Sequence, residues 1–250
     1  MASEIIVETT DLVKVYKQGQ VRAVDGLNLV IRRGEIYALI GANGTGKTTA
    51  IKMITGVLAP TAGSIKVFGM ELPRHRYVVA RHIGVSPQEY AIYPDLTVEE
   101  NIRFFAQVYD LDKRTYIAKM DELIHVMRLE EKRKTLGVNL SGGMKRRVSI
   151  ACALIHSPEL IIFDEATVGV DPVLRAYFWS YFKELRDQGT TIILTSHVMD
   201  EAEKADRIGL MRGGKLIAEG SPEELKATNG VHSIEEVFLK LSEGVDDDRE

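Results

Sequence analysis

The chain is short of cysteine, of positive charge and of long apolar runs, and each shortage excludes a class of protein. Its single cysteine, Cys152, has no partner for an intramolecular disulfide, so we expect a reducing, cytosolic setting. The formal net charge is -4 at pH 7, whereas a large nucleic-acid interface usually needs a basic domain. We therefore expect no nucleic-acid partner.

Long apolar segments are also missing. The apolar runs, such as Leu160–Phe163, have at most the length of a strand, whereas a helix that spans a bilayer needs about 20 apolar residues. The first residues, Met1–Glu8, lack the basic start and the apolar stretch of a signal peptide. A role at a membrane would therefore depend on a partner.

What the chain does contain is the pattern of an α/β fold. Its 250 residues, 45% of them hydrophobic, suit one large domain or a domain with a subdomain. Patterning predicts strands at 7–15, 21–31, 35–40 and 64–68, a polar turn at 17–20, and a helix at 47–55 that Gly56 ends. The pattern predicts an inserted helical subdomain at residues 97–156. It also predicts buried strands of a parallel sheet at 160–163 and 191–195.

Three segments have the sequence of a capping box, in which a serine or threonine is followed three residues later by glutamate. They are residues 97–100, 221–224 and 233–236. The last should start an amphipathic helix that places Ile234, Val237, Phe238 and Leu241 on one face. We expect that face to pack against the core.

A glycine-rich turn follows the strand predicted at 35–40. Residues 41–48 match the phosphate-binding pattern G-x-x-x-x-G-K-[S/T] in full. Glycine lets backbone N–H groups turn inward around phosphates, and the helix starting at Lys47 directs its positive dipole end at the same anion. Lys47 would neutralise phosphate oxygens, and Thr48 would ligate Mg²⁺. The predicted nucleotide contacts are Gly41, Ala42, Asn43, Gly44, Thr45, Gly46, Lys47, Thr48 and Thr49.

Two adjacent carboxylates, Asp164 and Glu165, follow the apolar run Leu160–Phe163. An α/β sheet binds its ligands at the carboxyl ends of its strands. Asp164 suits Mg²⁺ coordination, and Glu165, one residue later, can polarise an attacking water. Alone, such a pair could equally be a solvated strand end; after a complete phosphate-binding loop, it indicates a catalytic pair.

A second glycine-rich helix start lies at Ser141-Gly142-Gly143, just before a helix predicted to run to about His156. Serine and two glycines at a helix start form an anion site, although in isolation they could be a plain N-cap. The basic run Lys145–Arg147 that follows is expected to be a solvated or interface-facing surface rather than a nucleic-acid patch.

Together these motifs resemble the nucleotide-binding subunit of ABC transporters. The phosphate-binding loop, Gln88, Leu140–Gly143, Asp164-Glu165, Asp171 and His197 have the order and spacing of that family, over roughly residues 5–220. The resemblance implies a P-loop NTPase core with a parallel sheet, an N-terminal antiparallel β subdomain and the inserted helical subdomain. It divides a single domain, 1–250, into a core at 1–90 and 157–220, a helical signature subdomain at 91–156, and C-terminal helices with an acidic tail at 221–250.

The resemblance also implies a role for individual residues. Tyr16 would stack on adenine, Gln88 would reach the metal and the attacking water, and His197 would contact the γ-phosphate. Tyr90, Ile92 and Tyr93 would line the groove that receives a helix of a membrane permease. Two copies would pair head to tail, so that Lys47, Thr48, Gln88, Asp164, Glu165 and His197 of one face Ser141, Gly142, Gly143 and Asp171 of the other.

The chain departs from the family pattern at two positions. Met144 stands where glutamine usually follows the signature, and Ala166 where proline usually follows the catalytic glutamate. The Gly143-Met144 variant and the segment 233–239 resemble ATPase subunits that pair with separate six-helix export permeases. We therefore expect an ATP- and Mg²⁺-dependent motor at the cytoplasmic face of a membrane, acting in export. An importer ATPase and a non-transport ABC ATPase remain the alternatives.

Overall fold

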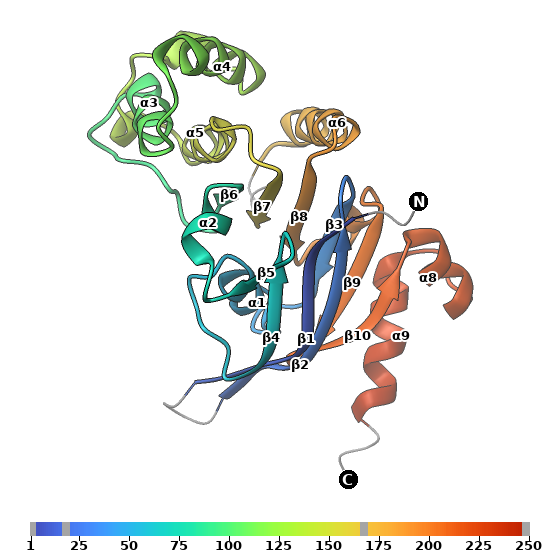
Figure 1. The fold of residues 1–250 in the computed structure, drawn as a ribbon. Coiled ribbons are helices and arrows are strands. Elements are labelled where there is room, and N and C mark those ends of the chain that lie inside the picture. The colour runs from blue at the N-terminus through green and yellow to red at the C-terminus, as the bar shows by residue number, and fades with distance from the viewer. Residues whose placement is uncertain (1–3, 17–20, 166–169, 247–250) are drawn as a thin grey trace.

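The computed structural model describes residues 4–16, 21–165 and 170–246 of the chain. The turn predicted at 17–20, residue Ala166 and the last four residues of the acidic tail lie outside the described residues. Two sheets and a set of helices make up the described part (Figure 1).

The N-terminal sheet is antiparallel, with the strand order β2-β1-β4-β5. Its strands are β1 (Ile5–Tyr16), β2 (Val21–Arg32), β4 (Ala62–Val67) and β5 (Met70–Leu72). β1 pairs with both β2 and β4, and β5 pairs with β4 at the edge. The antiparallel β subdomain expected from the sequence is therefore confirmed.

The second sheet has the strand order β10-β9-β3-β8-β7-β6. The strands are β3 (Ile36–Ile40), β6 (Ile83–Ser86), β7 (Leu160–Asp164), β8 (Thr191–Ser196), β9 (Arg207–Arg212) and β10 (Lys215–Gly220). All neighbours are parallel except β10, which pairs antiparallel with β9. The sheet is thus mostly parallel, and the α/β fold class is confirmed with one correction at this edge. β10 lies at the edge of the sheet, and its residues are exposed or half-buried, so it does not need the apolar run of its neighbours.

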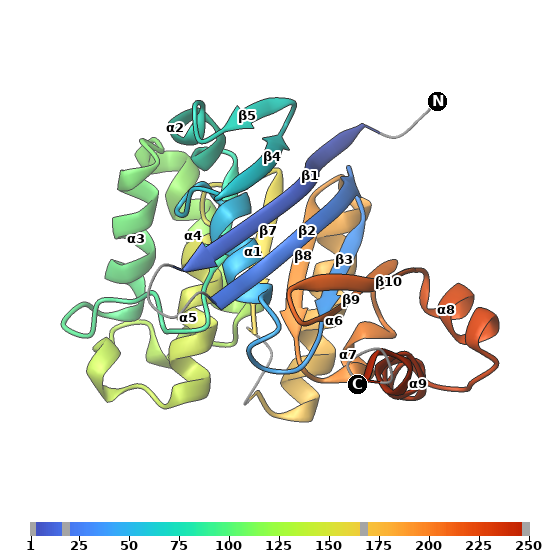
Figure 2. The same ribbon diagram turned by 90° about the horizontal axis from the view of Figure 1, so that it is seen from below.

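Successive side chains of β3 alternate between two hydrophobic cores, and this strand therefore joins the layers of the molecule. Ile36, Ala38 and Ile40 pack into a core with the helices on one face, whereas Tyr37 and Leu39 pack into a second core beneath the antiparallel sheet. Helix α1 (Lys47–Ile54) contributes to this second core, between the two sheets (Figure 2). The phosphate-binding turn is therefore held between two sheets at the end of a fully buried strand.

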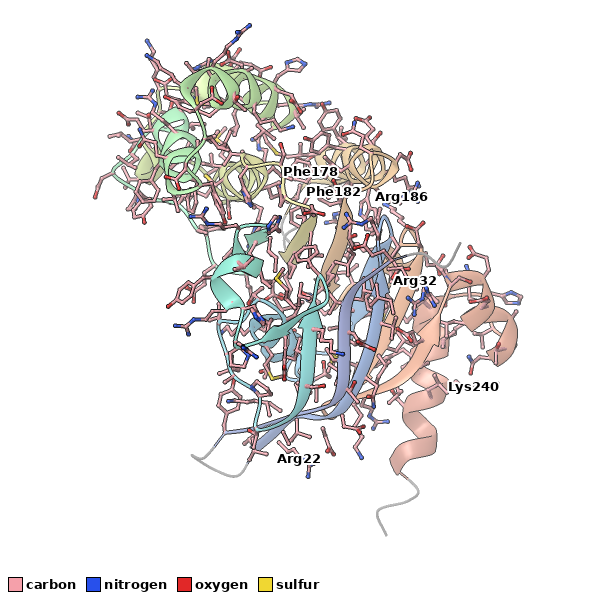
Figure 3. All side chains as sticks on the ribbon, viewed as in Figure 1. Arg22, Arg32, Phe178, Phe182, Arg186 and Lys240 are labelled. Atoms are coloured by element: carbon pink, nitrogen blue, oxygen red, sulfur yellow. The ribbon has the colours of Figure 1, made fainter. Side chains whose placement is uncertain are left out.

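Helices α3 (Val98–Val108), α4 (Lys113–Val126) and α5 (Gly142–Leu154) gather at one end of the molecule, with α6 (Pro172–Asp187) beside them (Figure 1). The short η1 (Glu130–Lys132) and η2 (Gly137–Asn139) lie between α4 and α5 in the chain. Phe178 and Phe182 of α6 lie between that helix and the sheet, where the ring of Phe182 stacks on Phe163 at 4.5 Å (Figure 3). These contacts attach the helical end to the strand that carries the acidic pair.

The remaining helices are α2 (Arg76–Ala80), α7 (Met199–Ala202), α8 (Pro222–Asn229) and α9 (Ile234–Asp246). On α9, Ile234 and Val237 are buried and Phe238 and Leu241 pack against the core, so the predicted apolar face is confirmed. Capping boxes are present at Thr97 and Ser221. At the third, Ser233 accepts from the backbone N–H of Glu236, but Glu236 accepts from His232 instead of Ser233. The reciprocal bond thus moves back by one residue.

Candidate nucleotide-binding site

Four parallel strands end at one edge of the sheet, and each leads into a segment of the site. β3 leads into the phosphate-binding turn, β6 into Gln88, β7 into Asp164 and Glu165, and β8 into His197. β3, β8, β7 and β6 are consecutive neighbours in the sheet. Residues that are far apart in the chain therefore meet at the carboxyl ends of the strands, where α/β sheets bind ligands.

The phosphate-binding turn adopts a backbone that requires glycine. Gly44 and Gly46 have φ values of 80° and 102°, which residues with a Cβ rarely adopt. A Cβ on Gly46 would also lie 2.1 Å from the carbonyl oxygen of Ala23 on β2. The turn after β9 also contacts the phosphate-binding turn, because the N–H of Gly214 donates to the carbonyl of Thr45 at 3.1 Å.

Lys47 is the first residue of α1, and its side chain folds back over the turn. Its Nζ donates to the carbonyls of Gly41 and Ala42 at 2.6 and 3.0 Å. Burial lowers the pKa of the Lys47 ammonium, and the nearby charges of Glu165 and Asp164 oppose that shift. Lys47 is thus a buried ammonium group beside the backbone N–H groups of a helix start, a combination that attracts phosphate.

The acidic pair is buried and tightly held. The Asp164 carboxylate accepts from the hydroxyls of Thr195, at 2.5 Å, and Thr48, at 3.4 Å. The N–H of Glu165 is bonded to both the carbonyl and the hydroxyl of Thr195 on β8, and Glu165 has a φ of 52°. A left-handed backbone at a residue other than glycine is a strained conformation that often marks a functional site. The side chain of Asp164 contacts Thr48 and Thr195, and that of Glu165 has other partners.

Both carboxylate oxygens of Glu165 have a partner from a different strand end. Gln88 Nε2 donates to one oxygen at 3.2 Å, and His197 Nδ1 lies 3.3 Å from the other. Each contact joins residues predicted separately as catalytic. The orientation of the Glu165 carboxylate is therefore fixed from both sides.

The phosphate-binding turn, Gln88 and Glu165 line an open cavity of about 270 Å³. Its lining consists of Ala23, Asn43, Gly44, Gly46, Lys47, Thr48, Thr49, Gln88 and Glu165. Tyr16 lies at its margin, with its hydroxyl 3.5 Å from that of Thr49, and the ring is 40% exposed. An exposed aromatic face next to a phosphate-binding turn suits stacking on a base.

Ser141, Gly142, Gly143 and Asp171 do not line this cavity. Ser141 caps α5 by accepting from the N–H of Met144, and Asp171 caps α6 by accepting from the N–H of Leu174. Ser141, Gly142 and Asp171 are all exposed. The structure thus brings the P-loop, Gln88, the acidic pair and His197 together, and leaves the signature segment facing outward.

The sequence predicted a solvated or interface-facing surface for the basic run Lys145–Arg147, and the solvated alternative is wrong for its two arginines. Arg146 is 7% exposed and donates to the carbonyls of Pro87 and Gln88. Arg147 is half-buried and donates to the carbonyls of Met127 and Arg128. Arginine can satisfy two carbonyls with one guanidinium, and that outweighs the tendency of a charge run to face water.

Sequence reasoning also missed two residues that organise the site. Thr195 bonds both members of the acidic pair, and the polar run that ends the strand at Thr195-Ser196 was the available signal. Buried Asn101 bonds the N–H of Tyr93 and the carbonyls of Tyr93, Leu96 and Thr97. It therefore fixes the loop in which the permease groove was predicted.

The fold and this geometry define a P-loop nucleotide-binding domain. Comparison with known proteins then places it in a family: the family model described as "ABC transporter" matches residues 24–168. The chain is 39% identical over 243 residues to the "Probable multidrug ABC transporter ATP-binding protein YbhF" of Escherichia coli, which covers 95% of this chain and 42% of that protein. It is 40% identical over 220 residues to the "Nod factor export ATP-binding protein I" of Rhizobium etli, covering 88% of this chain and 69% of that protein.

A solved dimer of the ATP-binding cassette MJ0796, bound to ADP and Pi, superposes with a TM-score of 0.81 at 25% identity. The match covers 86% of this chain and 98% of that one. The chain belongs to the ABC transporter family, as one of its ATP-binding, ATP-hydrolysing domains. It spans less than half of the length of several relatives, including the E. coli protein. Among the described residues, no helix is both long and apolar enough to cross a bilayer.

Proposed function

We propose that this domain drives export through a separate membrane permease, by closing and opening an ATP-dependent head-to-tail dimer. The observation that carries the proposal is the split of the predicted site: the cavity holds the P-loop, Gln88 and Glu165, whereas Ser141–Gly143 and Asp171 are displayed elsewhere on the surface. The dimeric state of the MJ0796 cassette, with ADP and Pi bound, supports such a pairing.

In the proposed site, the P-loop backbone and Lys47 bind the β- and γ-phosphates, and Tyr16 stacks on the adenine. Glu165 accepts a proton from the attacking water, and Gln88 and His197 hold its two oxygens in place. Ser141 and the start of α5 from the second copy stabilise charge on the γ-phosphate in a seam that excludes water. Asp171 of that copy, the N-cap of α6, faces the same nucleotide across the seam.

The donor set fits Mg²⁺, which prefers oxygen ligands. The Thr48 hydroxyl and the Asp164 carboxylate are already within 3.4 Å of each other, and the exposed Gln88 amide lies next to Glu165. We propose Thr48, Asp164 and Gln88 as the residues that hold the ion. When bound, Mg²⁺ neutralises negative charge on the phosphate oxygens.

We propose that the permease docks on the groove beside Tyr90, Ile92 and Tyr93. Tyr90 and Tyr93 are each 47% exposed, and a cavity of about 210 Å³ lies between β6, α3 and α5. The cavity is lined by Val85, Ala91, Phe105, Tyr109, Ser149, Cys152 and Ala153. The loop runs from the Gln88 end of β6 into α3, so it can pass dimer closure on to the partner. Such docking would hold the domain at the cytoplasmic face of the membrane.

The names of the two relatives, which include "multidrug" and "export", favour export over import. We also propose the division into a core at 1–90 and 157–220, a helical subdomain at 91–156 and C-terminal helices at 221–250. The division is supported by α5, which ends at Leu154, and by α8, which begins at Pro222, each within a few residues of a proposed boundary.

Mixing two inactive variants tests the shared site. Lys47→Ala removes the phosphate-binding ammonium but keeps the signature, and Ser141→Arg does the reverse. Each alone should lack ATP hydrolysis, whereas an equimolar mixture should regain it, because one site of the mixed dimer combines an intact P-loop with an intact signature. An inactive mixture in which sedimentation shows the mixed dimer, with ATP still bound by Ser141→Arg, would refute the head-to-tail site. Purification from native membranes identifies the partner: a six-helix permease supports export, and an additional secreted binding protein supports import.

A further inference from the structure

Two neighbouring arginines on α5 make the same kind of bond to different parts of the molecule. Arg147 binds the carbonyls of Met127 and Arg128, which follow α4 in the same helical region. Arg146 instead reaches across to the carbonyls of Pro87 and Gln88, in the loop that leaves β6. Only the second contact joins α5 to a residue of the proposed catalytic site.

The contact of Arg146 is close and buried. Its two terminal nitrogens each lie 2.5 Å from a carbonyl oxygen, one of Pro87 and one of Gln88. The guanidinium is also 5.2 Å from the centre of the Tyr90 ring, within the range of a cation–π interaction. A planar fork with two parallel donors matches two consecutive carbonyls better than any other side chain does. The loop is therefore fixed on both sides of Gln88.

The same tyrosine reaches the start of α5. A Cβ added to Gly142 would lie 2.8 Å from the Tyr90 hydroxyl oxygen, so the tyrosine hydroxyl lies over the signature segment. On the other side of the loop, the Gln88 side chain donates to Glu165. An unbroken series of contacts thus runs from Gly142 through Tyr90 and Arg146 to Gln88 and Glu165.

We propose that Arg146 is a positioning residue that ties the signature helix to the Gln88 loop of the same chain. This inference rests on the proposed function, in which the two ends of that connection serve different nucleotides. Gln88 and Glu165 act on the nucleotide of their own P-loop, whereas Ser141–Gly143 act on the nucleotide bound by the second copy. Through Arg146, a movement of the Gln88 loop at one site displaces the signature at the other.

The test compares Arg146→Met with Arg147→Met in the full-length chain. Both changes remove a guanidinium that binds two carbonyls and keep a comparable apolar stem. We expect Arg146→Met to lower kcat for ATP hydrolysis about 10- to 100-fold, the range seen when a catalytic group is misplaced, with ATP binding to the monomer unchanged. Arg147→Met should change kcat less than about 2-fold, although it too lowers the melting temperature.

Two further measurements separate positioning from a general loss of structure. Amide hydrogen exchange should rise at residues 88–91 in Arg146→Met and at 127–129 in Arg147→Met. In a Gln88→Ala background, Arg146→Met should reduce kcat no further than about 2-fold, because its effect passes through Gln88. Equal kcat losses for the two arginine variants, or an undiminished loss in the Gln88→Ala background, would overturn the proposal.

Milder variants keep the test decisive if Arg146→Met does not fold. Arg146→Lys keeps the charge but cannot bond both carbonyls, and Tyr90→Leu removes the ring from a half-exposed position. Each should lower kcat several-fold without changing ATP affinity; wild-type kcat in both overturns the proposal. A Gln88→Ala variant with wild-type kcat would remove Gln88 from the proposed function as well. A slow Gln88→Ala variant beside fully active Arg146→Lys and Tyr90→Leu variants would refute only the role of Arg146.

Discussion

The P-loop and the signature segment are built alike and placed differently. Each is a glycine-rich turn before a helix, Gly41–Gly46 before α1 and Ser141 before α5. The first lies between two sheets, with Lys47 buried and Gly46 pressed against Ala23. In the second, Ser141 and Gly142 are exposed and Gly143 is half-buried. A Cβ on Gly143 would touch nothing within 4 Å, although one on Gly142 would lie 2.8 Å from the Tyr90 hydroxyl.

This difference shows that the same local chemistry can serve two purposes. A helix start enclosed by its own chain is preorganised for a ligand, because its geometry is already fixed before binding. A helix start whose first residues are exposed gains its function only when another surface covers it. Substitutions in each half can therefore separate enclosure from exposure, and the largest effect is expected at Glu165.

Glu165→Gln should abolish the chemistry of the enclosed half while leaving its binding intact. The amide cannot accept a proton from water, so single-turnover hydrolysis should slow about 10²- to 10⁴-fold, the usual contribution of a general base. ATP affinity, measured by titration, should stay close to that of the wild type. Near-normal single-turnover hydrolysis would show that Glu165 is not the base.

Ser141→Arg should have the opposite profile. Placed at the centre of the proposed interface, the new charge should weaken ATP-dependent dimerisation about 10²- to 10³-fold, the cost of an unpaired buried charge. ATP binding by the monomer should not change. Sedimentation of the variant in the Glu165→Gln background with ATP measures both; persistent dimers would mean that the displayed segment does not lie at the interface.

Acid should weaken the helical end of the molecule in particular. His156, just after α5, stacks on Tyr109 and bonds the Ile83 carbonyl, and its burial lowers the pKa of the imidazole from 6.5 to about 4. The unfolded chain takes up this proton below pH 6.5 and the folded chain only near pH 4, so the free energy of unfolding falls as pH falls through that window. The full loss is about 3 kcal/mol, and none is expected above the window.

Urea unfolding at pH 7 and pH 5 measures this loss. His156→Gln keeps a hydrogen-bond donor but does not titrate, so its loss of stability between the two pH values should be smaller by about 2 kcal/mol. An identical pH dependence in the variant would mean that His156 titrates as it does in the unfolded chain.

The smallest effects come from adding one methyl group to each turn. Gly46 has a φ of 102°, and an added Cβ would lie 2.1 Å from a backbone oxygen. We therefore expect Gly46→Ala to destabilise the fold by about 1–3 kcal/mol and to weaken ATP binding. Gly143→Ala has open space in a helix and should stabilise it by about 0.5–1 kcal/mol. Thermal unfolding of the two variants should move in opposite directions; a shared direction would show that the turns are equally enclosed.

The enclosed half was largely predictable from the sequence, because its signals are local. The P-loop, the acidic pair and their strands follow from short patterns, and Lys47, Thr48 and Asp164 meet as expected. The burial of Arg146 and its hydrogen-bond partners could not be predicted in this way. Its partners are the carbonyls of Pro87 and Gln88, about 60 residues earlier in the chain, and no pattern around Arg146 encodes them. Thr195 does have a local signal, the polar end of its strand, but the sequence does not show that its partners are Asp164 and Glu165, at the end of another strand.

The contact between Gly214 and the P-loop bears on how the protein is made. The N–H of Gly214 bonds Thr45, and the carbonyl of Gly214 accepts from Asp25, so the turn after β9 closes both the P-loop and β2. The lysine and threonine that define the nucleotide site leave the ribosome early, but the residues that close around them follow much later. A nascent chain should therefore be unable to hold ATP in a completed site until the turn at Gly214 has emerged, and the first half of the domain depends on the second for its shape.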